Sequence, residues 1–147
     1  MLGHTWRFGV KNDTGVQIDT GKATIKSRMW KGSSDGTVAF QGSEGSIYSN
    51  SANITDGSYL AEDTYDNSSN EYEGGDFELS VTFDSGDTPS GDVLVYFERS
   101  TDGGTTWPDD GANGDNEDNA HLVCVMSITE TAGLGTAGEV YVKPFEL

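Results

Sequence analysis

Carboxylates are the most abundant chemical groups in this sequence, and five of them crowd one short segment. The segment is Trp107–Asn119 (WPDDGANGDNEDN), with Asp109, Asp110, Asp115, Glu117 and Asp118. Oxygen-rich acidic loops of this kind can hold Ca²⁺. The EF-hand spacing is absent, because no Gly follows the aspartates at the required place. We therefore expect a solvated acidic loop and no bound metal. Calcium binding remains the alternative, with Asp109, Asp110, Asp115 and Asp118 as its candidate ligands.

The other titratable residues form no pattern that catalysis requires. His4 and His121 stand alone, without the spaced partners of a zinc site. The remaining carboxylates are scattered, so no acid and nucleophile pair can be selected among them. Cys124 is the one cysteine and lies in the apolar run HLVCVMSI, which predicts a buried free thiol. The sequence thus predicts no catalytic residue, no cofactor and no enzymatic activity.

The segment Ser100–Trp107 (STDGGTTW) has the residue types of a tight turn after a strand. An aspartate at position 102 can accept backbone N–H groups across the turn, and the two following glycines permit unusual backbone angles. The pattern resembles the Asp-box turns of sialidase propellers. A propeller needs repeated blades of about 40–50 residues, and the chain has one copy of the motif. We therefore predict a structural turn. Its residues are Ser100, Asp102, Gly104, Thr106 and Trp107.

The charge is strongly acidic and unevenly distributed. The 147 residues include 25 Asp and Glu against 8 Lys and Arg, a formal net charge of −17. This balance argues against nucleic-acid binding, which needs a basic surface. Residues 1–31 hold most of the cations, and none lies between Gly32 and Glu98. Such a segment either pairs with the acidic body of the same fold or docks on a neighbouring acidic surface, as an arm or an edge hairpin. The candidate docking residues are Arg7, Lys11, Lys22, Lys26, Arg28 and Lys31.

Nothing in the sequence predicts contact with a membrane. No apolar run approaches the about 20 residues of a membrane-spanning helix. The first residues, MLGHTWRF, lack the apolar core of a signal peptide. We therefore expect a soluble protein that binds neither nucleic acid nor membrane.

Short strands with alternating apolar residues predict an all-β fold. The clearest patterns are Ala23–Trp30, Asp76–Phe83, Val93–Glu98, Leu122–Ile128 and Glu139–Phe145, and shorter ones occur at Thr5–Val10, Val16–Ile18, Thr37–Gln41 and Ser46–Tyr48. This number and spacing favour a single antiparallel β-sandwich or jelly roll over residues 1–147. Two polar segments, Ser49–Gly75 and Trp107–Asn119, are expected to be long loops.

Aromatic residues allow two interpretations. They could form a platform for a sugar ring, but packing within the core and loops is the commoner role of such side chains. The candidates are Trp6, Trp30, Tyr48, Tyr59, Tyr65 and Tyr72.

The run Gly74–Trp107 (GGDFELSVTFDSGDTPSGDVLVYFERSTDGGTTW) resembles small β-sandwich virion proteins of tailed bacteriophages. In those proteins a strand of this kind is followed by a Gly/Pro turn, a second strand and a Ser-x-Asp-Gly-Gly turn. Phe8–Thr14 with Gly15 and Val16 also resembles a hairpin of phage structural proteins, although there the hairpin often lies near the C-terminus.

The resemblance implies a non-enzymatic structural role. It implies a capsid decoration or cement protein on the virion exterior, assembled in the host cytoplasm as a homo-oligomer, for which we expect a trimer. Its partners would be the major capsid protein or neighbouring virion subunits. The alternatives are a neck or tail protein, and a carbohydrate-binding or host-adhesion module that uses Ser49–Gly75 or Pro108–Asn119.

Overall fold

The fold consists of β-strands joined by turns and loops. The computed structural model describes residues 5–33, 35–40, 45–69, 71–107, 120–128 and 140–147, and within these ranges it contains no helix. The strands are β1 (Thr5–Asp13), β2 (Ala23–Gly32), β3 (Val38–Phe40), β4 (Gly45–Ser49), β5 (Tyr59–Asp66), β6 (Gly74–Thr82), β7 (Gly91–Ser100), β8 (His121–Ile128) and β9 (Val140–Glu146).

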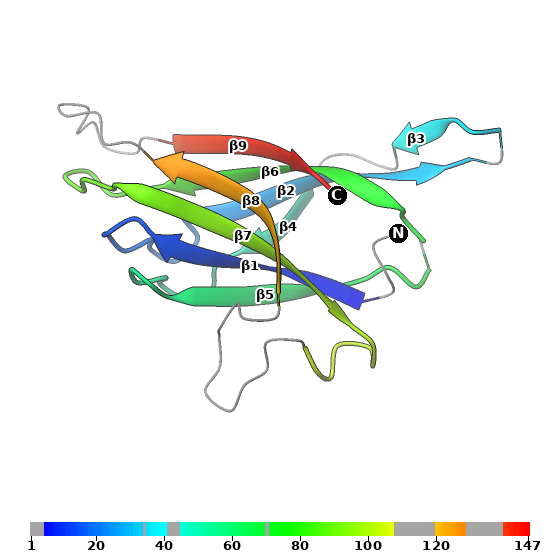
Figure 1. Ribbon diagram of the computed structural model, residues 1–147, viewed down its shortest axis with the longest axis horizontal. Coiled ribbons are helices and arrows are strands. Elements are labelled where there is room, and N and C mark those ends of the chain that lie inside the picture. Colours follow the sequence, from blue (N-terminus) through cyan, green and yellow to red (C-terminus); the bar gives the residue numbers. More distant parts are fainter. Residues whose placement is uncertain (1–4, 34, 41–44, 70, 108–119, 129–139) are drawn as a thin grey trace.

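These strands form two antiparallel sheets that pack face to face (Figure 1). The first sheet has the order β5-β1-β7-β8. The second has the order β3-β2-β6-β9, and β4 also pairs with β2. The expected all-β sandwich is therefore confirmed.

The core lies between the sheets and is made by alternate residues of the strands. In β6, Phe77, Leu79 and Val81 are buried, and the residues between them face away from the core. Phe8 of β1 contacts Phe77 edge-on, with 5.1 Å between the ring centroids. Aromatic rings in this geometry add to the stability that comes from burying apolar area. Ring contacts between strands of different sheets thus hold the two layers together.

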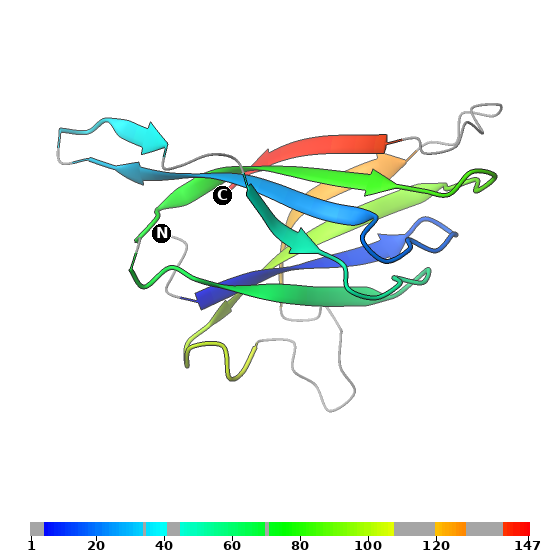
Figure 2. The same cartoon turned by 180° about the vertical axis from the view of Figure 1, so that it is seen from behind.

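One flank of the sandwich is closed by β4 and β5. Figure 2 shows β4 leaving its own sheet toward β5 of the other. The Tyr48 side chain is fully buried, and its hydroxyl donates to the Leu60 carbonyl at 3.0 Å. This bond joins an edge of each sheet.

Strand β5 contradicts the expectation of a long loop over Ser49–Gly75. Among the described strands it pairs with β1 alone, and it is an edge strand of the first sheet. Its sequence, YLAEDTYD, mixes acidic and aromatic residues because only part of an edge strand is covered by the core. The shorter pattern at Val16–Ile18 forms no strand; Ile18 makes an isolated bridge with Ile54.

The structure also contradicts an N-terminal docking arm or edge hairpin. β1 lies between β5 and β7 in one sheet. In the other sheet, β2 pairs with β6 along one edge and with both β3 and β4 along the other. Residues 5–31 therefore supply an interior strand to each sheet. They are part of the scaffold.

Cys124 is a buried free cysteine, as the apolar run around it predicted, and burial raises the pKa of its thiol. No helix in the described part of the chain is long and apolar enough to cross a membrane.

Candidate functional site

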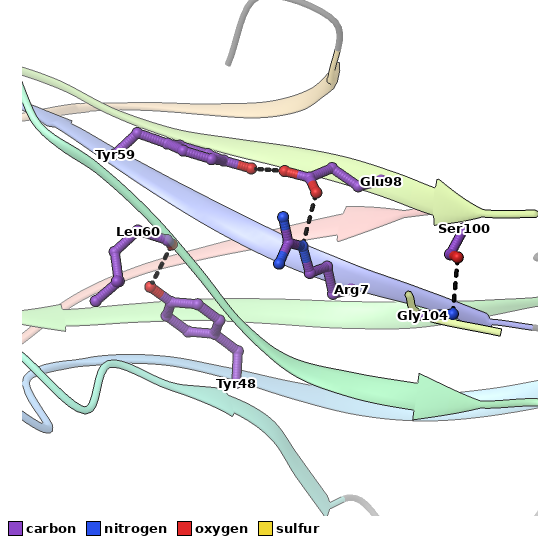
Figure 3. Close-up of polar contacts among 7 residues, drawn as sticks. All are labelled: Arg7, Tyr48, Tyr59, Leu60, Glu98, Ser100 and Gly104. Atoms are coloured by element: carbon purple, nitrogen blue, oxygen red, sulfur yellow. Dashed lines mark hydrogen bonds and ion pairs between the residues drawn. The ribbon is translucent and has the colours of Figure 1, made fainter. Parts of the chain in front are cut away.

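The turn after β7 has the hydrogen bonds that its sequence predicted. The Ser100 hydroxyl accepts the Gly104 N–H at 2.7 Å, a bond drawn in Figure 3, and donates to the Asp102 carboxylate at 2.7 Å. That carboxylate also accepts the N–H groups of Thr105 at 3.1 Å and Thr106 at 2.9 Å. The polar groups of Ser100 and Asp102 thus act within the turn itself.

Backbone conformation and electrostatics both fit this geometry. Gly103 and Gly104 have φ angles of 76° and 93°, in the region that favours glycine. Hydrogen bonds from the Thr106 N–H and from the side chains of Ser100 and Thr106 lower the pKa of Asp102 from 3.8 to about 2. Asp102 is therefore ionised at neutral pH, and its charge stabilises the folded turn.

A buried polar cluster lies beside this turn on the outer face of the first sheet (Figure 3). Glu98 is only 1% exposed, and its carboxylate accepts hydrogen bonds from the Arg7 Nε at 2.7 Å and from the Tyr59 hydroxyl. Arg7 and Glu98 are directly opposite each other on β1 and β7. The Arg7 guanidinium also lies 4.3 Å from the centroid of the Trp107 ring. The cluster links β1, β5 and β7 to the turn.

Gly9 makes room for this cluster. A β-carbon at position 9 would overlap the Tyr59 ring, so the tyrosine reaches Glu98 only because β1 has no side chain there. Tyr59 also meets Tyr96 edge-on, with ring centroids 5.7 Å apart. The aromatic pair and the glycine together fill this part of the sheet face.

The candidate docking residues do not gather on one surface. Arg7 is held by Glu98, and Lys11 lies on the same strand, 3.9 Å from Asp13. Lys26 and Arg28 project from the outer face of the other sheet, opposite β6. Lys22 is exposed in the segment before β2, and Lys31, at the end of β2, lies 3.9 Å from Glu71. These cations belong to opposite faces of the sandwich, so the described chain offers no continuous basic patch made from all six.

The packing interpretation is confirmed for four of the aromatic residues, so these tyrosines do not form the platform that was predicted as the alternative. Tyr48 and Tyr59 are buried. Tyr65 stacks on Trp6 with 4.7 Å between the ring centroids, and Tyr72 packs against the core. These rings are engaged in the protein and do not form an exposed row.

The acidic segment Trp107–Asn119 is where the sequence placed the candidate calcium ligands. Asp109, Asp110, Asp115 and Asp118, the candidate calcium ligands, lie outside the described residues. Within the described ranges, no group of three or more His, Cys, Asp or Glu side chains is arranged to hold a metal ion.

Three buried asparagines close the loops, and the sequence interpretation missed them. Asn12 donates to the carbonyls of Val16 and Ile54 at 2.7 and 2.8 Å. Asn50 accepts the Ala23 N–H at 2.9 Å. Asn67 exchanges two hydrogen bonds, each of 2.9 Å, with the backbone of Tyr72. Asparagine suits this work because it has both a donor and an acceptor for backbone groups. Only Asn12 had a signal in the sequence, since it belongs to the hairpin pattern that resembles phage proteins.

Comparison with known proteins gives no relative: no protein-family model, curated protein or solved structure matches this chain.

Proposed function

We propose that this chain is a non-enzymatic structural protein of a tailed-bacteriophage virion, and specifically a decoration protein on the capsid exterior. The observation that carries the proposal is the run Gly74–Trp107, in which the resemblance lies. It folds as β6, β7 and a self-contained turn, with one strand in each sheet. The conspicuous polar residues of the run serve the scaffold, as expected for a structural protein.

The flank formed by strand β8 is the surface we propose for docking. The large apolar side chains most exposed in the described part of the chain are Leu122 (44%), Val125 (40%) and Val142 (51%). Leu122 and Val125 belong to β8 and Val142 to β9, which are edge strands of the two sheets on the same side of the sandwich (Figure 1). Leu122 and Val125 pair with Tyr96 and Leu94 and face outward from the first sheet, whereas Val142 pairs with Ser80 and faces outward from the second. The two residues of β8 are therefore the exposed apolar pair on one face, and such groups mark protein interaction sites.

Charge supports the choice of this flank over the basic residues of the N-terminal segment. Strand β8 (HLVCVMSI) contains no carboxylate, in a chain whose net charge is −17. Burial of apolar area then supplies the affinity, because exposed ion pairs contribute only about 0–1 kcal/mol each. We propose the major capsid protein or a neighbouring virion subunit as partner, with the protein itself a homo-oligomer, for which a trimer is our working model.

Mass spectrometry of purified particles tests the proposal. The chain should be found in full virions of the phage that encodes it, in a copy number comparable with that of the major capsid protein. A neck or tail protein would instead be present in far fewer copies and would co-purify with isolated tails. Absence of the chain from purified virions would refute any structural role in the particle.

A further inference from the structure

A groove lined by hydroxyl-bearing residues and one carboxylate lies at the end of the first sheet, next to the turn after β7. Its volume is about 440 Å³, and its lining includes Thr5, Thr64, Asp66, Ser68, Ser100 and Thr101. Thr5 pairs with Asp66 on one side and with Ser100 on the other, so these three residues form one row across β5, β1 and β7. The volume is within the range of about 300–1,000 Å³ that is typical of small-molecule sites.

The walls of this groove are held in place by hydrogen bonds. The Ser100 hydroxyl binds the Gly104 N–H at 2.7 Å, which fixes the turn against the sheet (Figure 3). The Asp66 carboxylate accepts the Ser68 N–H at 2.8 Å, which fixes the segment after β5. A ligand that binds here does not have to order these two segments, and a preorganised site keeps more of its interaction energy as affinity.

The chemistry of the lining selects the kind of ligand. Thr64, Ser68 and Thr101 are exposed, and each hydroxyl can both donate and accept a hydrogen bond. The described lining residues include one carboxylate and no Lys or Arg, so this part of the groove does not favour an anion.

We propose that this groove binds a saccharide through a neutral or amino-substituted ring. Sugar hydroxyls match lining hydroxyls that can each donate and accept a hydrogen bond, and the Asp66 carboxylate can accept from a ring hydroxyl or an ammonium group. The proposed contacts are polar, because the described lining residues of the groove include no aromatic side chain. This inference is independent of the capsid role and does not use the four packed tyrosines.

The test combines a glycan array with an NMR titration of the full chain. The array carries neutral, amino and acidic glycans, and the titration uses galactose, glucosamine and glucuronate. We expect neutral or amino sugars to bind and glucuronate not to bind. The backbone amide signals of Ser68, Thr101 and Gly103 should shift. The proposal is overturned if no glycan on the array binds, or if bound sugar shifts only amides outside the groove.

Variants inside and outside the groove distinguish specific binding at this site from nonspecific binding. Thr64→Val and Thr101→Val each remove an exposed hydroxyl and keep a β-branched side chain, so the fold should persist. Each should weaken binding about three- to tenfold, the effect of losing one hydrogen bond. Ser127→Ala is the control, since Ser127 binds Asp92 at the opposite end of β7 and should have no effect. Equal binding by the threonine variants and the wild type would also overturn the proposal.

Discussion

Arg7 is a charged residue whose partners lie inside the fold. Its guanidinium donates to Glu98 and covers the Trp107 ring, while the Glu98 side chain is completely buried. A buried carboxylate without its partner is costly, because the charge has been removed from water without compensation. By contrast, Lys11 on the same strand lies 3.9 Å from a half-exposed Asp13. The two cations therefore differ in what their removal should do.

We expect Arg7→Met to lower the free energy of unfolding by about 3 kcal/mol, because it removes the cation that is paired with the buried Glu98 carboxylate. Lys11→Met is the matched control and should change it by about 0–1 kcal/mol. Urea denaturation of both variants measures the difference. Equal effects of the two substitutions would show that the buried pair has no special role in stability.

A second prediction concerns how the stability that Asp102 contributes changes as the pH falls. Its pKa is about 2 in the fold against an ordinary 3.8, so the unfolded chain takes up this proton first as the pH falls. The stability that this carboxylate supplies is complete above about pH 4, and it is lost progressively as the pH falls toward 2. An NMR titration of the carboxyl carbons should give the low pKa in the wild type. In Ser100→Ala the value should rise toward 3.8, because one of the hydrogen bonds is removed. A titration of Asp102 near 3.8 in the wild type would contradict the geometry of the turn.

At the scale of elements, the sequence predicted strands wherever one face was regularly apolar. Phe77, Leu79 and Val81 alternate with polar residues, and they are buried as the period of two requires. Strand β5 was missed because it is an edge strand whose pattern is broken by Glu62, which binds the Ser51 N–H at 2.6 Å. Its pairing with β1 also shifts register between Trp6 and Phe8. Neither the hydrogen bond of Glu62 nor the shift in register can be recognised from the local sequence.

One part of the candidate site could likewise be predicted from the sequence and another part could not. The turn from Ser100 to Trp107 was predictable because its hydrogen bonds join residues at most four apart. The Arg7 and Glu98 pair was not, since these residues are 91 apart in sequence and meet only through the register of β1 and β7. The sequence likewise placed six cations in one segment. It did not show that adjacent strands would carry them to different sheets.

The prediction at the scale of elements is that removal of residues 1–15 prevents the chain from folding. The deletion takes away β1, the strand between β5 and β7, together with the buried Trp6, Phe8 and Val10. We expect a chain without cooperative thermal unfolding and without dispersed amide signals in NMR spectra. A truncated protein that still unfolds cooperatively would mean that the segment is a detachable arm after all.

At the scale of the whole molecule, charge and shape limit how the chain can associate. With a net charge of −17, copies repel one another over about 10 Å at 0.1 M salt. Stable association then depends on an uncharged surface large enough to bury about 800 Å² on each partner. The flank formed by β8, with Leu122 and Val125, is the region of the described surface that we propose for this role. Added salt should preserve or strengthen contact through this flank, because it screens the repulsion.

The central claim is tested most directly by binding the purified chain to capsids that lack it. We expect saturable co-sedimentation with the shells, retained at high salt. It should be lost when Leu122→Glu and Val125→Glu are combined, and kept when Lys26→Ala and Arg28→Ala are combined. Failure of the folded wild-type chain to sediment with capsids, or sedimentation with isolated tails instead, would contradict the account.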